Sequence, residues 1–190
     1  MKEDSQIKVK YPEIGVCGLS CRLCPNYHMN TKSQCLGCKS KDRIAVGCPF
    51  ITCAVKKRKI EFCWDCEDKR TCEKWKKHRE KGKKRDSFKC YQTLEEDIAF
   101  LEENGAVEFE KLQKVKERIL VKMLKDFNEG RLKSYYCIAA SVLKTKELKE
   151  ALRKAENESD GLDITGKSKV LHKALDEIAG SKKYCLKLRK

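Results

Sequence analysis

The sequence predicts a mostly α-helical protein with a small, irregular, cysteine-rich module in its N-terminal half. Ten of the thirteen cysteines lie between Cys17 and Cys72, and the large apolar residues in that stretch are sparse and follow neither a helical nor a strand repeat. In residues 92–190, by contrast, apolar residues recur at intervals of three and four, which is the pattern of amphipathic helices. The predicted fold class follows from this contrast.

Charge divides the chain at nearly the same place. Residues 1–91 contain 23 lysines and arginines against 11 acidic residues, whereas residues 92–190 contain 21 against 18. We therefore predict two domains. The first is a cysteine-rich module that ends in a basic helical segment (1–91), and the second is a helical domain (92–190).

Local signals place the first helices. Residues 71–85 have a helix-forming composition. Thr93 followed three residues later by Glu96 is a capping-box pattern, which predicts the start of the next helix. Asn104 and Gly105 then supply a stop signal for that helix.

Apolar repeats place the remaining helices. A helix is expected over residues 107–127. The apolar residues 135–143, with further leucines up to residue 152, predict either one broken helix or two consecutive helices. A polar, glycine-punctuated loop is expected over residues 156–166, followed by a last helix that Gly180 ends.

The clustered cysteines have the spacing of metal ligands. The two sulfurs of a Cys-x2-Cys turn can approach one ion at about 2.3 Å, and a second pair completes a tetrahedron. One predicted set is Cys21, Cys24, Cys35 and Cys38, and the other is Cys48, Cys53, Cys63 and Cys66. A cross-braced pairing of the same residues fits equally, and Cys17 and Cys72 are further candidate ligands.

Ligand type favours zinc at two sites, because thiolates select zinc among the common divalent ions. An iron–sulfur protein stays open as the alternative, since eight thiolates also hold two four-iron clusters. The Cys24-Pro25 and Cys48-Pro49 pairs are similar to the Cys-Pro that closes bacterial ferredoxin motifs, but the tight cysteine run that precedes it there is missing here.

Three stretches carry a resemblance to a known family. They are CGLSCRLCPNY (17–27), CLGC (35–38) and FCWDCEDKRTCEKW (62–75). Together they resemble an uncharacterised family of cysteine-rich prokaryotic proteins that is known only as a domain of unknown function. The stretch FNEGRLKSYYCIAASVL (127–143) also resembles longer members of that family, so the resemblance covers most of the chain. Where members of that family often have a proline before the last cysteine, this chain has Thr71. The resemblance implies a metal-binding module and brings no established activity with it.

A strongly basic region follows the cysteines. Residues 69–89 contain eleven lysines and arginines against three acidic residues. This charge is typical of a surface that contacts nucleic-acid phosphates, with Trp64, Trp75 or Phe88 as candidate stacking faces. A solvated helix face, or charge that balances the metal-bound thiolates, explains the same composition.

The other reactive side chains are scattered. We expect Cys90, Cys137 and Cys185 to be small buried apolar residues. The three histidines, His28, His78 and His172, are interpreted as surface or hydrogen-bonded residues rather than ligands.

The sequence therefore predicts a zinc-binding structural or interaction protein, with a protein partner that the sequence does not name and a nucleic acid as a further candidate partner. The alternative is an iron–sulfur electron carrier. An enzyme with an open metal position is not expected, because the thiolates outnumber the ligands such a site uses. With no apolar leader and no span in the sequence, we expect a soluble cytoplasmic protein that does not enter a membrane; its oligomeric state is left open.

Overall fold

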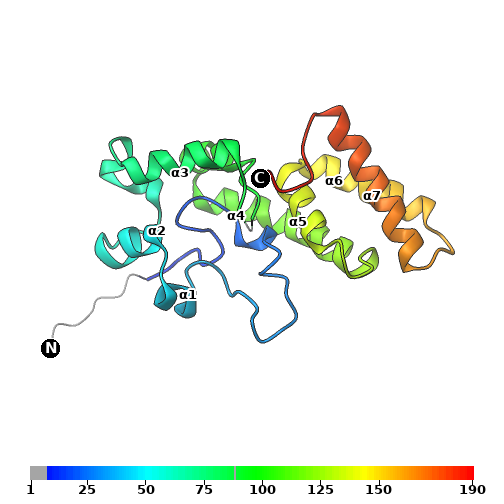
Figure 1. Ribbon diagram of the computed structural model, residues 1–190, viewed down its shortest axis with the longest axis horizontal. Helices are drawn as coiled ribbons and strands as arrows, with labels where there is room; N and C mark the ends of the chain where they lie inside the picture. Colours follow the sequence, from blue (N-terminus) through cyan, green and yellow to red (C-terminus); the bar gives the residue numbers. More distant parts are fainter. Residues whose placement is uncertain (1–7, 88) are drawn as a thin grey trace. The chain divides into compact units, whose positions relative to one another are not determined.

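The protein is described by a computed structural model over residues 8–87 and 89–190. Within those residues the fold is helical, as predicted, with seven α-helices and no β-strand (Figure 1). The single bridge between Ile14 and Ser20 closes a loop and belongs to no sheet. None of the helices in the described ranges combines the length and the apolar character that crossing a lipid bilayer requires.

The chain divides into two compact units. The first contains the described residues up to Arg22, then Asn26–Lys84 and Leu94–Glu110, and the second contains Leu23–Pro25, Arg85–Thr93 and Lys111–Lys190. Each unit is thus built from segments that are discontinuous in the sequence. The domain boundary predicted near residues 86–92 stays a prediction.

The cysteine-rich stretch consists of short helical turns joined by loops (Figure 1). In chain order these turns are the 3₁₀ helix η1 (Cys21–Leu23), α1 (Lys41–Val46), α2 (Pro49–Ile51), the π-helix η2 (Thr52–Lys57), and the 3₁₀ helices η3 (Cys63–Asp65) and η4 (Glu67–Arg70). They lead into α3 (Glu73–Lys84), which lies within the predicted helical segment. The module is therefore irregular, as expected.

The longest helix, α4 (Leu94–Asp126), starts where the Thr93–Glu96 pattern predicted. At Gly105, where a stop was expected, the backbone leaves the helical region with φ 78° and ψ 168°. The helix resumes directly afterwards, so the predicted stop is a kink between two helical segments. Only glycine adopts such a conformation without strain, which explains the residue at this point.

Three shorter helices complete the chain. They are α5 (Lys133–Val142), α6 (Thr145–Glu158) and α7 (Ile164–Ser181), so the apolar stretch after residue 135 forms two helices rather than a single broken one. The expected loop is shorter than predicted, because α7 already begins at Ile164. The carboxylate of Asp163 accepts the Gly166 N–H at 2.8 Å and caps that start.

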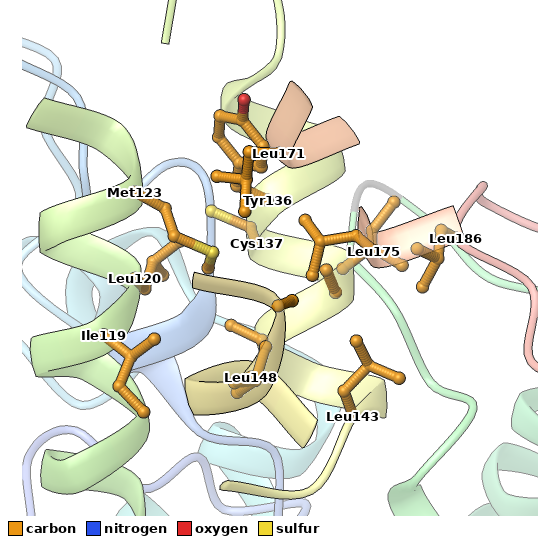
Figure 2. Close-up of a cluster of buried hydrophobic side chains, with 14 of the residues drawn as sticks. Ile119, Leu120, Met123, Tyr136, Cys137, Leu143, Leu148, Leu171, Leu175 and Leu186 are labelled. Atoms are coloured by element: carbon orange, nitrogen blue, oxygen red, sulfur yellow. The ribbon is translucent and has the colours of Figure 1, made fainter. Parts of the chain in front are cut away.

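The second unit has one continuous hydrophobic core, to which α4, α5, α6, α7 and the C-terminal tail contribute. Figure 2 shows these side chains pointing toward one another. The labelled residues are Ile119, Leu120, Met123, Tyr136, Cys137, Leu143, Leu148, Leu171, Leu175 and Leu186. Helices α6 and α7 pack against each other in this unit.

The first unit has two small apolar clusters instead of one core. One gathers Ile14, Phe62, Trp64, Leu101 and Phe109, and the other gathers Val16, Ile51, Ala54 and Val55. Clusters of four or five buried residues supply little of the free energy that a module of this size needs, so a further source of stability is expected.

Candidate metal centre

Backbone hydrogen bonds set the Cys63–Cys66 turn. The Cys63 N–H donates to the Val16 carbonyl at 2.9 Å, which ties the start of η3 to the loop that carries Cys17. The Cys66 N–H then donates to the Cys63 carbonyl at 3.3 Å. The Cys-x2-Cys segment is thereby held in a single tight turn, the conformation that presents two sulfurs in one direction.

Five cysteines gather in this part of the first unit. Burial raises the pKa of the Cys63 thiol, and charge interactions with four neighbouring cysteines raise it further. The Cys63 group is defined by these charge interactions and consists of Cys17, Cys53, Cys63, Cys66 and Cys72. It therefore includes Cys17 and Cys72, which the two predicted sets of four had left outside.

A cation lies next to the Cys63 group. The Arg58 guanidinium pairs with Asp68 at 2.5 Å and also interacts with Cys53 and Cys66. The hydrogen bond that Arg58 donates to Asp68, together with the charges of Asp68 and Cys66 and the Cys53 side chain, raises the pKa of Arg58. Arg58 therefore places a permanent positive charge where thiolates would carry negative charge.

Cys21 and Cys38, which lie outside the Cys63 group, are joined by a hydrogen bond. The Cys38 N–H donates to the Cys21 sulfur at 3.3 Å. The turn that allows this contact depends on Gly37, whose φ is +104°. A Cβ at that position would also stand 2.8 Å from the Pro12 carbonyl oxygen, so no larger residue fits there.

The Cys21–Cys38 contact lies beside a buried ion pair. The Lys39 ammonium is 2.6 Å from Glu61 Oε1 and 4.0 Å from the centre of the Phe62 ring, and its side chain has no exposed surface. Burial lowers the pKa of Lys39, while Glu61 and the thiols of Cys21 and Cys38 partly offset that effect. This lysine is thus a buried positive charge next to two candidate ligands.

Glu61 is held from a second direction as well. Its two carboxylate oxygens accept the backbone N–H groups of Lys10 and Tyr11 at 3.1 and 2.8 Å. Burial alone would raise the pKa of Glu61, but Lys39 and these two N–H groups outweigh it and hold the pKa below its usual range. The ion pair therefore connects the Cys35–Cys38 turn to the start of the described chain.

Cys24 belongs to the second unit and is buried there. Its neighbour is Cys137, whose pKa is raised to about 12, first by burial and then by Cys24. Cys90 is also buried, as predicted, and burial raises its pKa to about 11. The prediction for Cys185 was wrong: this residue is exposed, and its thiol donates to the Lys187 carbonyl at 3.4 Å.

All thirteen cysteines lie in the described part of the chain, and all are thiols rather than halves of disulfides. Across residues 8–87 and 89–190, no three His, Cys, Asp or Glu side chains are close enough together to hold one ion. Cys35 and Cys48 are half-buried, and Cys48 lines a groove together with Cys53. The assignment of the ten cysteines as ligands stays a prediction.

The histidines make contacts of three different kinds. His28 Nε2 lies 2.5 Å from the Arg22 carbonyl oxygen, and His78 is packed between the rings of Phe50 and Trp75. Burial lowers the pKa of His78. The His172 ring stacks on Tyr135 in the second unit.

Comparison with known proteins adds one finding. Residues 13–77 match DUF3795, a family of proteins of unknown function. The matched segment contains all ten clustered cysteines, so the predicted resemblance to a family of unknown function is confirmed. No curated protein and no solved structure shows a significant match to this chain.

Proposed function

We propose that the cysteine-rich part of the DUF3795 segment binds zinc through cysteine thiolates at two sites, and that the ions hold this module in its folded form. The observation that carries the proposal is the Cys63 group, in which four cysteines lie within range of charge interaction with Cys63 and none of the five is in a disulfide. Thiolates are the ligands that structural zinc sites use most, and metal-bound thiols lose their protons.

The energetics of the module support a structural role. Its two apolar clusters are small, and the short helices between Cys17 and Cys72 are too short to be stable alone. Structural zinc contributes folding free energy directly, because the site does not exist in the unfolded chain. Metal binding would therefore supply what the apolar clusters lack.

The positive charges next to the thiols, one buried and one exposed, also support the proposal. A zinc ion with four thiolates carries a net charge of −2, which is costly to bury without compensation. Lys39 stands beside Cys21 and Cys38, and Arg58 stands beside Cys53 and Cys66. For binding to occur, the sulfurs must approach one another more closely than they do in this structure.

The experiment is metal analysis of protein purified without oxygen. We expect colourless protein with two zinc ions per chain, and loss of at least one ion in Cys63→Ser and Cys66→Ser. The matched controls are Cys90→Ser and Cys185→Ser, which should retain both ions. A brown protein that contains iron and inorganic sulfide would favour the electron carrier instead, and protein without stoichiometric metal would contradict both.

The same proposal includes a cellular compartment and a binding partner. Ten thiols without disulfides suit a reducing compartment, so we place the protein in the cytoplasm. A metal-stapled module without a catalytic ligand position is best suited to interaction, with a protein or a nucleic acid. The surplus of basic residues in the first half of the chain favours a nucleic acid as the partner.

A further inference from the structure

One face of α3 is occupied by contacts within the first unit. Trp75 and Gly82 are buried, and His78 packs against Phe50. Arg79 donates two hydrogen bonds to the Glu95 carboxylate at 2.8 and 2.7 Å. These positions recur at intervals of three and four along α3, so they form one docked face.

A different face of α3 carries only lysines. The lysine stripe is defined as Lys74, Lys77, Lys81 and Lys84. All four are exposed, and their spacing of three, four and three residues places them in one row along the helix. At a rise of about 1.5 Å per residue, this row is roughly 15 Å long. Glu73 and Glu80 lie at its edge and are the acidic residues of the helix.

A groove extends the stripe to a second basic segment. Its volume is about 380 Å³, and both Lys57 of η2 and Lys74 of α3 line it. Lys56 and Lys57 are exposed. Lys57 and Lys74, which are seventeen positions apart in the sequence, are therefore brought to one surface of the first unit.

Two of the three aromatic side chains predicted as stacking faces, Trp64 and Trp75, do not serve this surface. Trp64 is 6 % exposed and stacks on Phe62, and Trp75 is 3 % exposed in the docked face of α3. Phe88 lies outside the described residues. Single-stranded nucleic acids are bound through such stacking platforms, whereas duplexes are bound through phosphates.

We propose that the lysine stripe, together with Lys57, binds the phosphate backbone of double-stranded nucleic acid without reading its bases. This proposal rests on the proposed function, because metal bound to the module would fix η2 relative to α3. An anionic membrane is the less favoured partner, since the stripe has no apolar side chain that would insert into lipid.

The test measures binding of the metal-loaded protein to a short DNA duplex of random sequence. Fluorescence anisotropy of the labelled duplex reports the binding, and it is recorded over a range of salt concentrations. The variant replaces the whole stripe, Lys74→Gln, Lys77→Gln, Lys81→Gln and Lys84→Gln. The control removes the same charge from exposed lysines of the second unit, Lys125→Gln, Lys146→Gln, Lys149→Gln and Lys182→Gln.

We expect the stripe variant to flatten the log–log salt slope by about 3 to 4 and to lower affinity at low salt by roughly tenfold or more. In the control variant, the salt slope and the affinity should both change much less. Equal losses in the two variants, absence of binding, or tighter binding to single strands or to vesicles containing phosphatidylserine would each overturn the proposal. Zinc content measured on the same samples keeps the two proposals apart, since the stripe contains no candidate ligand.

Discussion

Lys39 and Glu61, which are 22 residues apart in the sequence, form an ion pair of 2.6 Å in which the lysine side chain is fully buried and the glutamate side chain is 11 % exposed. Lys39 directly follows Cys38, and Glu61 precedes Cys63 by two residues. The pair thus joins the two stretches that carry most of the candidate ligands. Its contribution to stability should be measurable separately from metal binding.

Removing one partner of this pair should lower the free energy of unfolding more than removing both. In Lys39→Met the carboxylate of Glu61 stays behind without its buried counter-ion, and breaking such a pair costs about 3–5 kcal/mol. In Lys39→Met with Glu61→Leu the unpaired Glu61 carboxylate is removed as well, so the free energy of unfolding should recover in part. Urea unfolding of the zinc-loaded proteins measures both. A double variant that is less stable than the single one would refute this account of the pair.

The core of the second unit should respond to cavity formation. Leu148 of α6 has no exposed surface and belongs to the cluster shown in Figure 2. Leu148→Ala should lower the free energy of unfolding by about 2–5 kcal/mol, whereas Leu162→Ala, at a side chain that is 41 % exposed, should change it by less than about 0.5 kcal/mol. Circular dichroism during urea unfolding measures the difference. Similar values for the two variants would contradict the assignment of Leu148 to the core.

Replacing each of two glycines with alanine should change the stability of the protein in opposite directions. Gly105 has φ +78°, a conformation that strains any residue with a Cβ, so Gly105→Ala should destabilise the protein by about 1 kcal/mol or more. Gly180 is in α7 with open space around its Cβ position, so Gly180→Ala should stabilise by about 0.4–1 kcal/mol. Thermal unfolding of both variants tests the kink in α4. If both substitutions stabilised the protein, the assignment of a left-handed conformation to Gly105 would be wrong.

The C-terminal tail should detach in acid because of Asp86. This side chain has no exposed surface and accepts hydrogen bonds from the backbone N–H groups of Tyr91 and Arg189 and from the Arg189 side chain. Burial alone would raise its pKa, but Arg189 and these N–H groups outweigh it and lower the pKa. A carboxylate with a lowered folded-state pKa stabilises the fold above its ordinary pKa of about 3.9 and loses that contribution as pH falls through the folded value.

The measurement compares the free energy of unfolding of the wild type with that of Asp86→Asn over pH. The difference should be largest near neutral pH and should shrink below about pH 4, as the wild-type carboxyl takes up its proton. A difference that stays constant down to acid pH would show that the charge of Asp86 plays no part.

Helices that carry local signals were predicted well from the sequence. Thr93 marks the start of α4, and a glycine follows its end. The break between α5 and α6 was left open, and it is decided by Leu143, which is extended with ψ 148°, and by Glu147, whose carboxylate accepts the Lys144 N–H at 2.7 Å. The early start of α7 was missed, although Asp163 is an N-cap residue that would have signalled it.

The site was predictable only in part, because burial and long-range pairing decide it. Spacing predicted ten candidate ligands, yet no local rule brings Cys17 and Cys72 into the Cys63 group. Lys39 and Glu61 were missed altogether, since a lysine and a glutamate far apart in a charged sequence give no sign of meeting. Cys185 was expected to be buried, but in the tail it is the neighbouring Leu186 that enters the core.

The central claim is that metal holds the cysteine-rich module folded, and amide hydrogen exchange before and after chelation tests it most directly. With the ions removed under reducing conditions, peptides from residues 17–72 should lose their protection, because the binding free energy of a structural metal is folding free energy. Peptides from α5, α6 and α7 should keep theirs, since an apolar core holds these helices together. Unchanged protection of residues 17–72 in metal-free protein would contradict the account.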